Sequence, residues 1–132
     1  MSALFDHEII EPLHSSARSL VQRARASDGS GLIVKVPNQQ FPSFQQLAQF
    51  KREYAIARLC RHPGVIHPLA LQLHGGRWTM LQEDIGGQAL DRLLRAQLAK
   101  RQAPSQPALA LDDFFDIALQ LCAALEAVIV MA

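Results

Sequence analysis

Two residues of opposite charge, Lys35 and Glu53, carry the clearest chemical signal of this chain. Lys35 lies near the end of the apolar run 32–36, and Glu53 lies inside a helical pattern that begins after Pro42. A lysine at the end of a buried strand can neutralise nucleotide phosphates when an acid on the next helix holds its ammonium group. The pair therefore predicts a phosphate-binding site.

Each of these residues also has an ordinary alternative role. The long aliphatic side chain of Lys35 could simply carry its ammonium group to solvent. Glu53 could be a helix-surface acid paired with Arg52 or Arg58. The helix pattern, however, has one apolar stripe, made of Leu47, Phe50, Tyr54 and Ala57. An unpaired carboxylate beside a buried stripe is costly, which favours a cationic partner for Glu53.

The elements that must position the pair are three strands and a helix. Alternating and apolar runs predict strands at 8–14, 20–26 and 32–36, with a turn at Asp28-Gly29-Ser30-Gly31. Ser43 and Gln46 have the spacing of a capping box, which predicts a helix start. That helix is expected to stop at His62-Pro63-Gly64.

The second half of the chain predicts two more strands and then helices. The strands are expected at 69–73 and 78–82, around the turn His74-Gly75-Gly76-Arg77. A glycine-containing connector follows, then a helical pattern over 88–100 and a long helix from Leu111. This order predicts an α+β fold, a five-stranded antiparallel sheet with one helix laid across it, followed by a helical segment.

Composition limits the other functions. The chain has 132 residues, enough for one domain, with 49% hydrophobic residues and a net charge of +1. The electrostatic field of so small a net charge predicts neither nucleic acid nor a membrane surface as partner. Cys60 and Cys122 have no metal or redox spacing, and the five histidines match no zinc pattern. We therefore expect no metal site, reduced thiols and a cytoplasmic location.

Four short motifs, in this order, resemble the amino-terminal lobe of a protein kinase. They are Leu32-Ile33-Val34-Lys35, the segments 50–54 and 61–66, and the segment 80–90, Met-Leu-Gln-Glu-Asp-Ile-Gly-Gly-Gln-Ala-Leu. The resemblance runs from about residue 8 to 128. It is closest to the serine/threonine-kinase-like domain at the front of very large bacterial signalling proteins, which also carry an ATPase module and a histidine kinase module.

The resemblance implies a kinase-like small lobe at 8–87 and the first helices of an incomplete large lobe at 88–132. It also implies ATP as the ligand, bound with Mg²⁺ in a complete domain, and a role in signal transduction beside other domains of a signalling protein. Lys35 would contact the α- and β-phosphates, and Glu53 would orient it. Gln82 would close the back of the adenine pocket.

The remaining roles implied by the resemblance belong to the walls of that pocket. The backbone carbonyl of Glu83 and the N–H of Ile85 would meet the adenine edge. Gln88 would reach the ribose. Val21 and Val34 would cover the face of the adenine ring.

The turn between the first two strands departs from the family pattern. The stretch His14-Ser15-Ser16-Ala17-Arg18-Ser19 has no glycine, whereas the family uses glycine-rich backbone to approach phosphates. Serine hydroxyls and Arg18 could substitute. The alternative is a pseudokinase-type module for protein interaction that binds no nucleotide.

The catalytic motifs of the family do not occur in this sequence. It contains neither His-Arg-Asp nor Asp-Phe-Gly, and its one Asp-Phe, at Asp113-Phe114, is followed by Phe115. We therefore expect no phosphotransfer from this chain alone and interpret it as a truncated domain or a fragment. We also expect the last helix to expose apolar side chains and to promote self-association. The side chains in question are Leu119, Leu121, Leu125, Val128 and Ile129.

Overall fold

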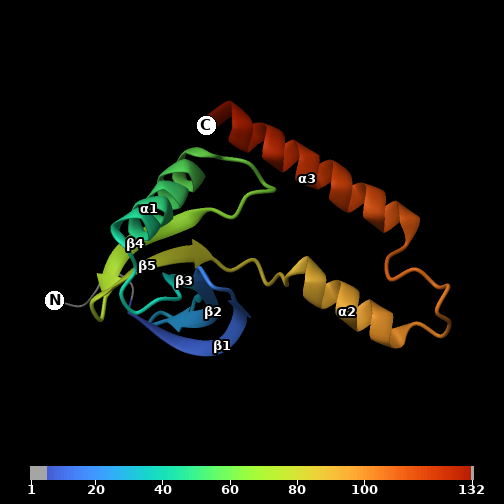
Figure 1. Ribbon diagram of the computed structural model, residues 1–132, viewed down its shortest axis with the longest axis horizontal. Coiled ribbons are helices and arrows are strands. Elements are labelled where there is room, and N and C mark those ends of the chain that lie inside the picture. The colour runs from blue at the N-terminus through green and yellow to red at the C-terminus, as the bar shows by residue number, and fades with distance from the viewer. Residues whose placement is uncertain (1–5, 132) are drawn as a thin grey trace.

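The structure, a computed structural model, describes residues 6–131 and has an α+β fold (Figure 1). The elements follow in the order β1 (His7–Ser15), β2 (Ser19–Ala26), β3 (Gly31–Pro37), α1 (Phe44–Leu59), β4 (Pro68–His74), β5 (Arg77–Glu83), α2 (Leu90–Lys100) and α3 (Leu111–Met131). The predicted order of strands and helices is confirmed. Helix α1 ends before the predicted stop, because the chain is already extended at Cys60.

The five strands form one antiparallel sheet in the order β1-β2-β3-β5-β4. Side chains alternate between the two faces of each strand, so Val34 and Lys35 of β3 point to opposite sides. On the Val34 side, apolar residues of three strands form the main buried cluster. It consists of Ala24, Leu32, Val34, Val36 and Leu81.

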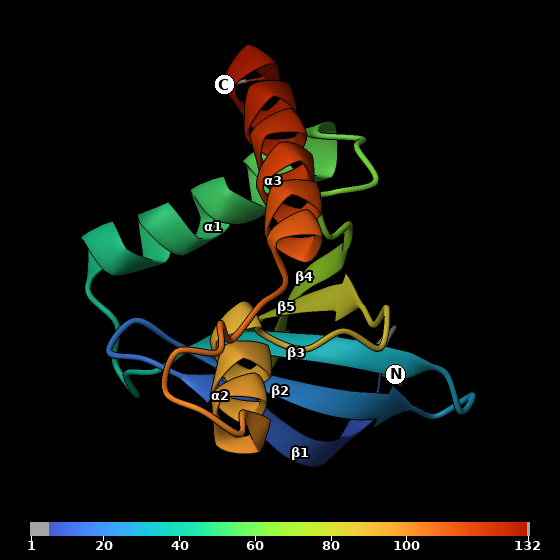
Figure 2. The same ribbon diagram turned by 90° about the vertical axis from the view of Figure 1, so that its right-hand side faces the viewer.

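Helix α1 covers the opposite side of the sheet, where it contacts β3 and β4. Its start is fixed by the predicted capping box, with Ser43 and Gln46 each accepting a backbone N–H from the other. Phe50 of α1 is buried, as is Met80 on β5. The helix therefore packs against the sheet, above β3 in the view of Figure 2. This position lets Glu53 of α1 reach Lys35 of β3.

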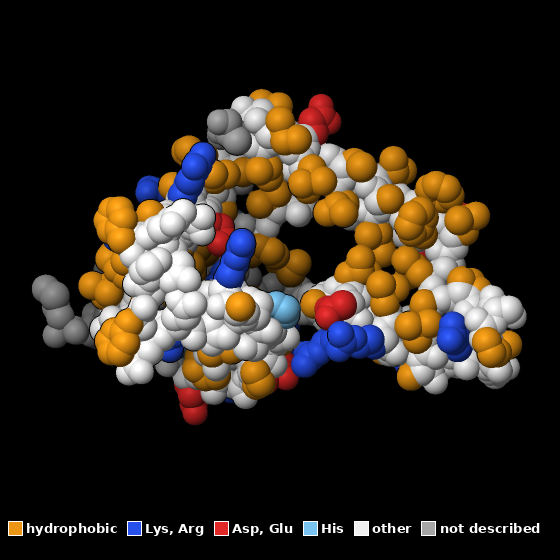
Figure 3. Space-filling view, in the orientation of Figure 1, with side chains coloured by type: hydrophobic (Ala, Val, Ile, Leu, Met, Phe, Trp, Pro, Cys, Tyr) orange, Lys and Arg blue, Asp and Glu red, His pale blue; other side chains and the backbone are white. Residues whose placement is uncertain are grey.

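Helices α2 and α3 extend away from the sheet. The carboxyl-terminal half of α3 contacts α1, and Ala124 is buried there. Many large apolar side chains are exposed along the whole of α3, as Figure 3 shows around the central opening. The exposed ones include Leu119, Leu121, Leu125 and Ile129, as predicted, whereas Val128 is half-buried. No helix within residues 6–131 has both the length and the apolar character needed to cross a membrane.

Candidate functional site

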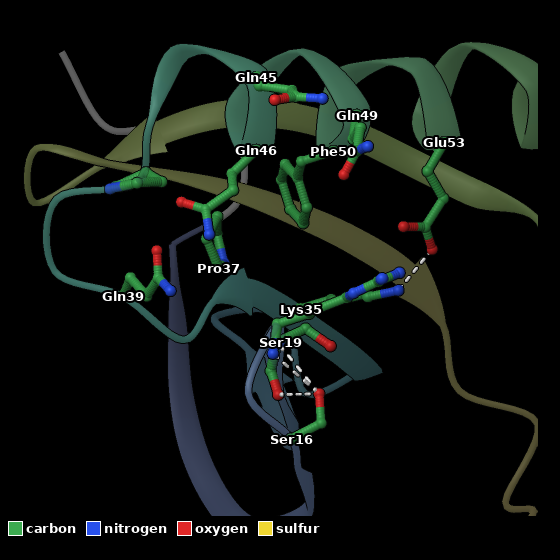
Figure 4. Close-up of a pocket in the computed structure, with 12 residues that line it drawn as sticks. Ser16, Ser19, Lys35, Pro37, Gln39, Gln45, Gln46, Gln49, Phe50 and Glu53 are labelled. Atoms are coloured by element: carbon green, nitrogen blue, oxygen red, sulfur yellow. Dashed lines mark hydrogen bonds and ion pairs between the residues drawn. The ribbon is translucent and has the colours of Figure 1, made fainter.

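Lys35 and Glu53 form the predicted ion pair. Lys35 Nζ, from β3, donates a hydrogen bond to Glu53 Oε1, from α1, and Figure 4 shows the two side chains pointing toward each other. The side chain of Lys35 is 20% exposed and that of Glu53 is 47% exposed. An ammonium group has three N–H donors, so the pair leaves Lys35 with donors for a further acceptor.

A polar pocket of about 510 Å³ adjoins this ion pair. It lies between the β1–β2 turn, the end of β3 and the first half of α1 (Figure 4). The residues that line it are Ser16, Arg18, Ser19, Lys35, Pro37, Gln39, Pro42, Gln45, Gln46, Gln49, Phe50 and Glu53. With two cations and several amide side chains, this polar pocket suits an anion better than an apolar ligand.

A second, apolar pocket of about 260 Å³ lies against the connector that follows β5. It is lined by Leu13, His14, Val21, Ile33, Ile66, Gln82, Glu83, Asp84, Ile85, Gly87, Gln88, Ala89 and Arg92. Four residues expected around an adenine ring are therefore brought together here, namely Val21, Gln82, Glu83 and Ile85, and Gln88, which was expected at the ribose, lines the same pocket. Among the described residues, the backbone N–H of Ile85 has no hydrogen-bond partner, so it can donate to a ligand.

Val34, the other residue expected to cover the adenine face, does not line this pocket. Its side chain is 2% exposed and belongs to the buried cluster on the other face of the sheet. Ile33 lines the pocket instead. The alternation of side chains along a strand could have indicated that Ile33, and not Val34, lines the pocket. Ile33 shares a face of the sheet with Lys35, and Val34 does not.

The two pockets lie side by side on one face of the sheet. Val21 is the cross-strand partner of Lys35, and the two side chains line the apolar pocket and the polar pocket respectively. Cross-strand partners on one face are about 5 Å apart. One elongated ligand can therefore place an apolar group beside the connector and a charged group beside Lys35.

Arg23 holds the connector in place, and the sequence reasoning missed this role. Its guanidinium donates to Glu11 Oε1 at 2.6 Å, to Asp84 Oδ2 at 2.9 Å and to the carbonyl of Gly87 at 3.0 Å. The hydrogen bonds to Glu11 and then to Asp84 raise the pKa of Arg23 above its ordinary value. The permanently charged Arg23 thus ties the connector, which forms one wall of the apolar pocket, to β1 and β2.

Asp84 also shapes the connector from within. Its Oδ1 accepts the backbone N–H of Gly86 at 2.8 Å, and Gly86 has a φ of 72° that favours glycine. In the sequence, the role of Arg23 could have been indicated by Glu11, an acid of the first strand that pairs with it across the strands. The contact with Asp84 spans 61 residues of sequence, and no local pattern indicates it.

Comparisons with known proteins do not identify the chain, since no protein-family model and no curated protein matches it. The described residues contain no group of three or more His, Cys, Asp or Glu side chains placed to hold a metal ion. The assignment of a function therefore depends on the two pockets and the Lys35–Glu53 pair.

Proposed function

We propose that this chain binds ATP, with the adenine in the apolar pocket and the phosphates beside Lys35 in the polar pocket. The observation that carries the proposal is the Lys35–Glu53 ion pair, which adjoins a pocket on the same sheet face lined by apolar side chains and the connector. Glu53 fixes the ammonium, and the ammonium neutralises phosphate charge.

The fold supports the same proposal. A five-stranded antiparallel sheet, crossed by a helix that supplies the acid, is the arrangement implied by the resemblance to a kinase small lobe. The chain would serve in signal transduction as part of a serine/threonine-kinase-like domain, beside other domains. Because His-Arg-Asp and Asp-Phe-Gly do not occur in the sequence, this chain alone would bind ATP without transferring its phosphate.

The second candidate is a pseudokinase-type module that binds other proteins and no nucleotide. The exposed apolar side chains of α3 favour it, among them Phe114, Phe115 and Leu119. Contiguous apolar surface of this kind is typical of protein contacts. It would also promote self-association of the chain in solution.

Unfolding of the protein with and without ATP separates the two candidates. A ligand that binds only the folded state stabilises it, by about 2.7 kcal/mol at ~100 times its dissociation constant. We expect ATP to raise the midpoint of chemical unfolding, and tripolyphosphate, which lacks the base, to raise it less. An unchanged midpoint at millimolar ATP would leave the interaction module as the better account.

A further inference from the structure

The turn between β1 and β2 uses its own backbone N–H groups. Ser16 Oγ accepts the N–H of Arg18 at 3.2 Å and that of Ser19 at 3.1 Å. The N–H of Ser16 donates to the carbonyl of Ser19 at 2.9 Å. Three N–H groups of this turn are therefore already occupied before any ligand arrives.

This turn consequently lacks the backbone arrangement that binds phosphate in a glycine-rich loop. Such an anion site needs successive N–H groups pointing at the ligand. Between Ser16 and Ser19, no two neighbouring residues both have an unoccupied backbone N–H. The positive φ values among the described residues all belong to glycines elsewhere in the chain.

Asn38 keeps the turn in this closed form. Its side-chain Nδ2 donates to Ser15 Oγ at 3.2 Å and also to the carbonyl of Ser16. Its backbone N–H donates to the carbonyl of Arg18 at 3.0 Å. Opening the turn to free its N–H groups would break bonds both within the turn and to the end of β3.

The side chains that face the polar pocket provide the positive charge instead. Arg18 and Lys35 both line it, and among the described residues Arg18 makes no ion pair. Glu53 is the one acid among the described residues that line the pocket, and it is engaged by Lys35. An arginine can donate two parallel hydrogen bonds to a phosphate group, which makes it a strong phosphate ligand.

We infer that the side chains of Arg18 and Lys35, and not the backbone of the β1–β2 turn, hold the phosphates of a nucleoside polyphosphate at this site. This inference rests on the proposed function and adds Arg18 as a binding residue. It also excludes the Ser16 hydroxyl as a substitute for the missing glycines, because that hydroxyl already donates to the carbonyl of Ser19 at 3.4 Å.

Calorimetric titration of the Arg18→Gln variant with ATP and with adenosine tests this role. A charge-assisted hydrogen bond contributes enough to predict about a tenfold loss of ATP affinity. Adenosine affinity should stay unchanged, and Arg18→Lys should recover part of the loss. Arg25→Gln is the matched control, because it removes an exposed arginine from the far end of β2 and should alter neither affinity.

The outcomes separate this inference from the function on which it rests. If the wild-type protein binds ATP and Arg18→Gln binds it equally well, Arg18 is not a phosphate ligand and the proposed function stands. Equal wild-type affinity for ATP and adenosine would overturn both the inference and the placement of the phosphates beside Lys35. If the wild-type protein binds neither compound, the proposed function fails and the inference fails with it.

Discussion

Replacing Lys35 with methionine is expected to weaken ATP binding by about tenfold to a hundredfold, with adenosine affinity unchanged. A hydrogen bond to a charged group contributes about 1.5–3 kcal/mol, and each 1.4 kcal/mol changes a dissociation constant about tenfold. Methionine keeps an unbranched apolar stem but removes the ammonium that faces the polar pocket. Isothermal titration calorimetry with the two ligands gives both affinities.

The variant should remain folded, since Glu53 is 47% exposed and water can solvate its carboxylate when the partner is lost. Lys51→Met is the matched control. Lys51 is an exposed residue of the same helix as Glu53, and its ammonium lies 4.2 Å from the centre of the Trp78 ring. Equal losses of ATP affinity in the two variants would point to net charge and would remove Lys35 from the site.

Replacing Leu81 with alanine is expected to lower the free energy of unfolding by about 2–5 kcal/mol, the range for buried leucines. Leu81 is 0% exposed and lies in the cluster on the sheet face opposite the pockets. Truncation leaves a cavity that the surrounding strands fill only in part. Urea unfolding followed by circular dichroism measures the change as a shift in midpoint.

Leu73→Ala supplies the control for this effect. Leu73 lies on β4, the neighbouring strand, but its side chain is 58% exposed. Surface substitutions usually change stability by no more than about 0.5 kcal/mol. A Leu81 variant as stable as the Leu73 variant would show that the cluster around Val34 is not the core of the sheet.

The strands could be predicted because their signals are local. Alternating side chains marked β2, and glycines marked the turns that separate paired strands. Gly29, Gly75 and Gly76 have φ values of 88°, 58° and 79°, which other residues rarely adopt. The capping box of Ser43 and Gln46 likewise acts within four residues of sequence. Such signals fix where an element begins and which residues share a face.

The pairing of Lys35 with Glu53 could also be predicted, because both ends of the pair carried a signal. Lys35 closed a buried strand, and Glu53 bordered an apolar stripe that had to lie on the sheet. Assigning Val34 to the pocket was a failure of the same reasoning. The alternation that places Lys35 on one face of β3 places Ile33 on the same face and Val34 on the other.

Other contacts between distant segments could not be predicted. Arg23 meets Asp84 across the sheet, and Asn38 reaches back to the β1–β2 turn. Both contacts depend on how the strands pair and curve, which no local pattern records. The closure of the turn by Ser16 could not be predicted either, because a serine in a turn has several possible hydrogen-bond partners.

The most direct test of the central claim is a two-dimensional ¹H–¹⁵N NMR titration of the protein with ATP. We expect saturable shifts, with one dissociation constant, for backbone amides in both pockets, including Ile33, Lys35 and Ile85. Amides of α3 that lie away from the sheet should stay in place. Unchanged spectra at millimolar ATP, or shifts confined to α3, would contradict the claim that one nucleotide occupies the two pockets.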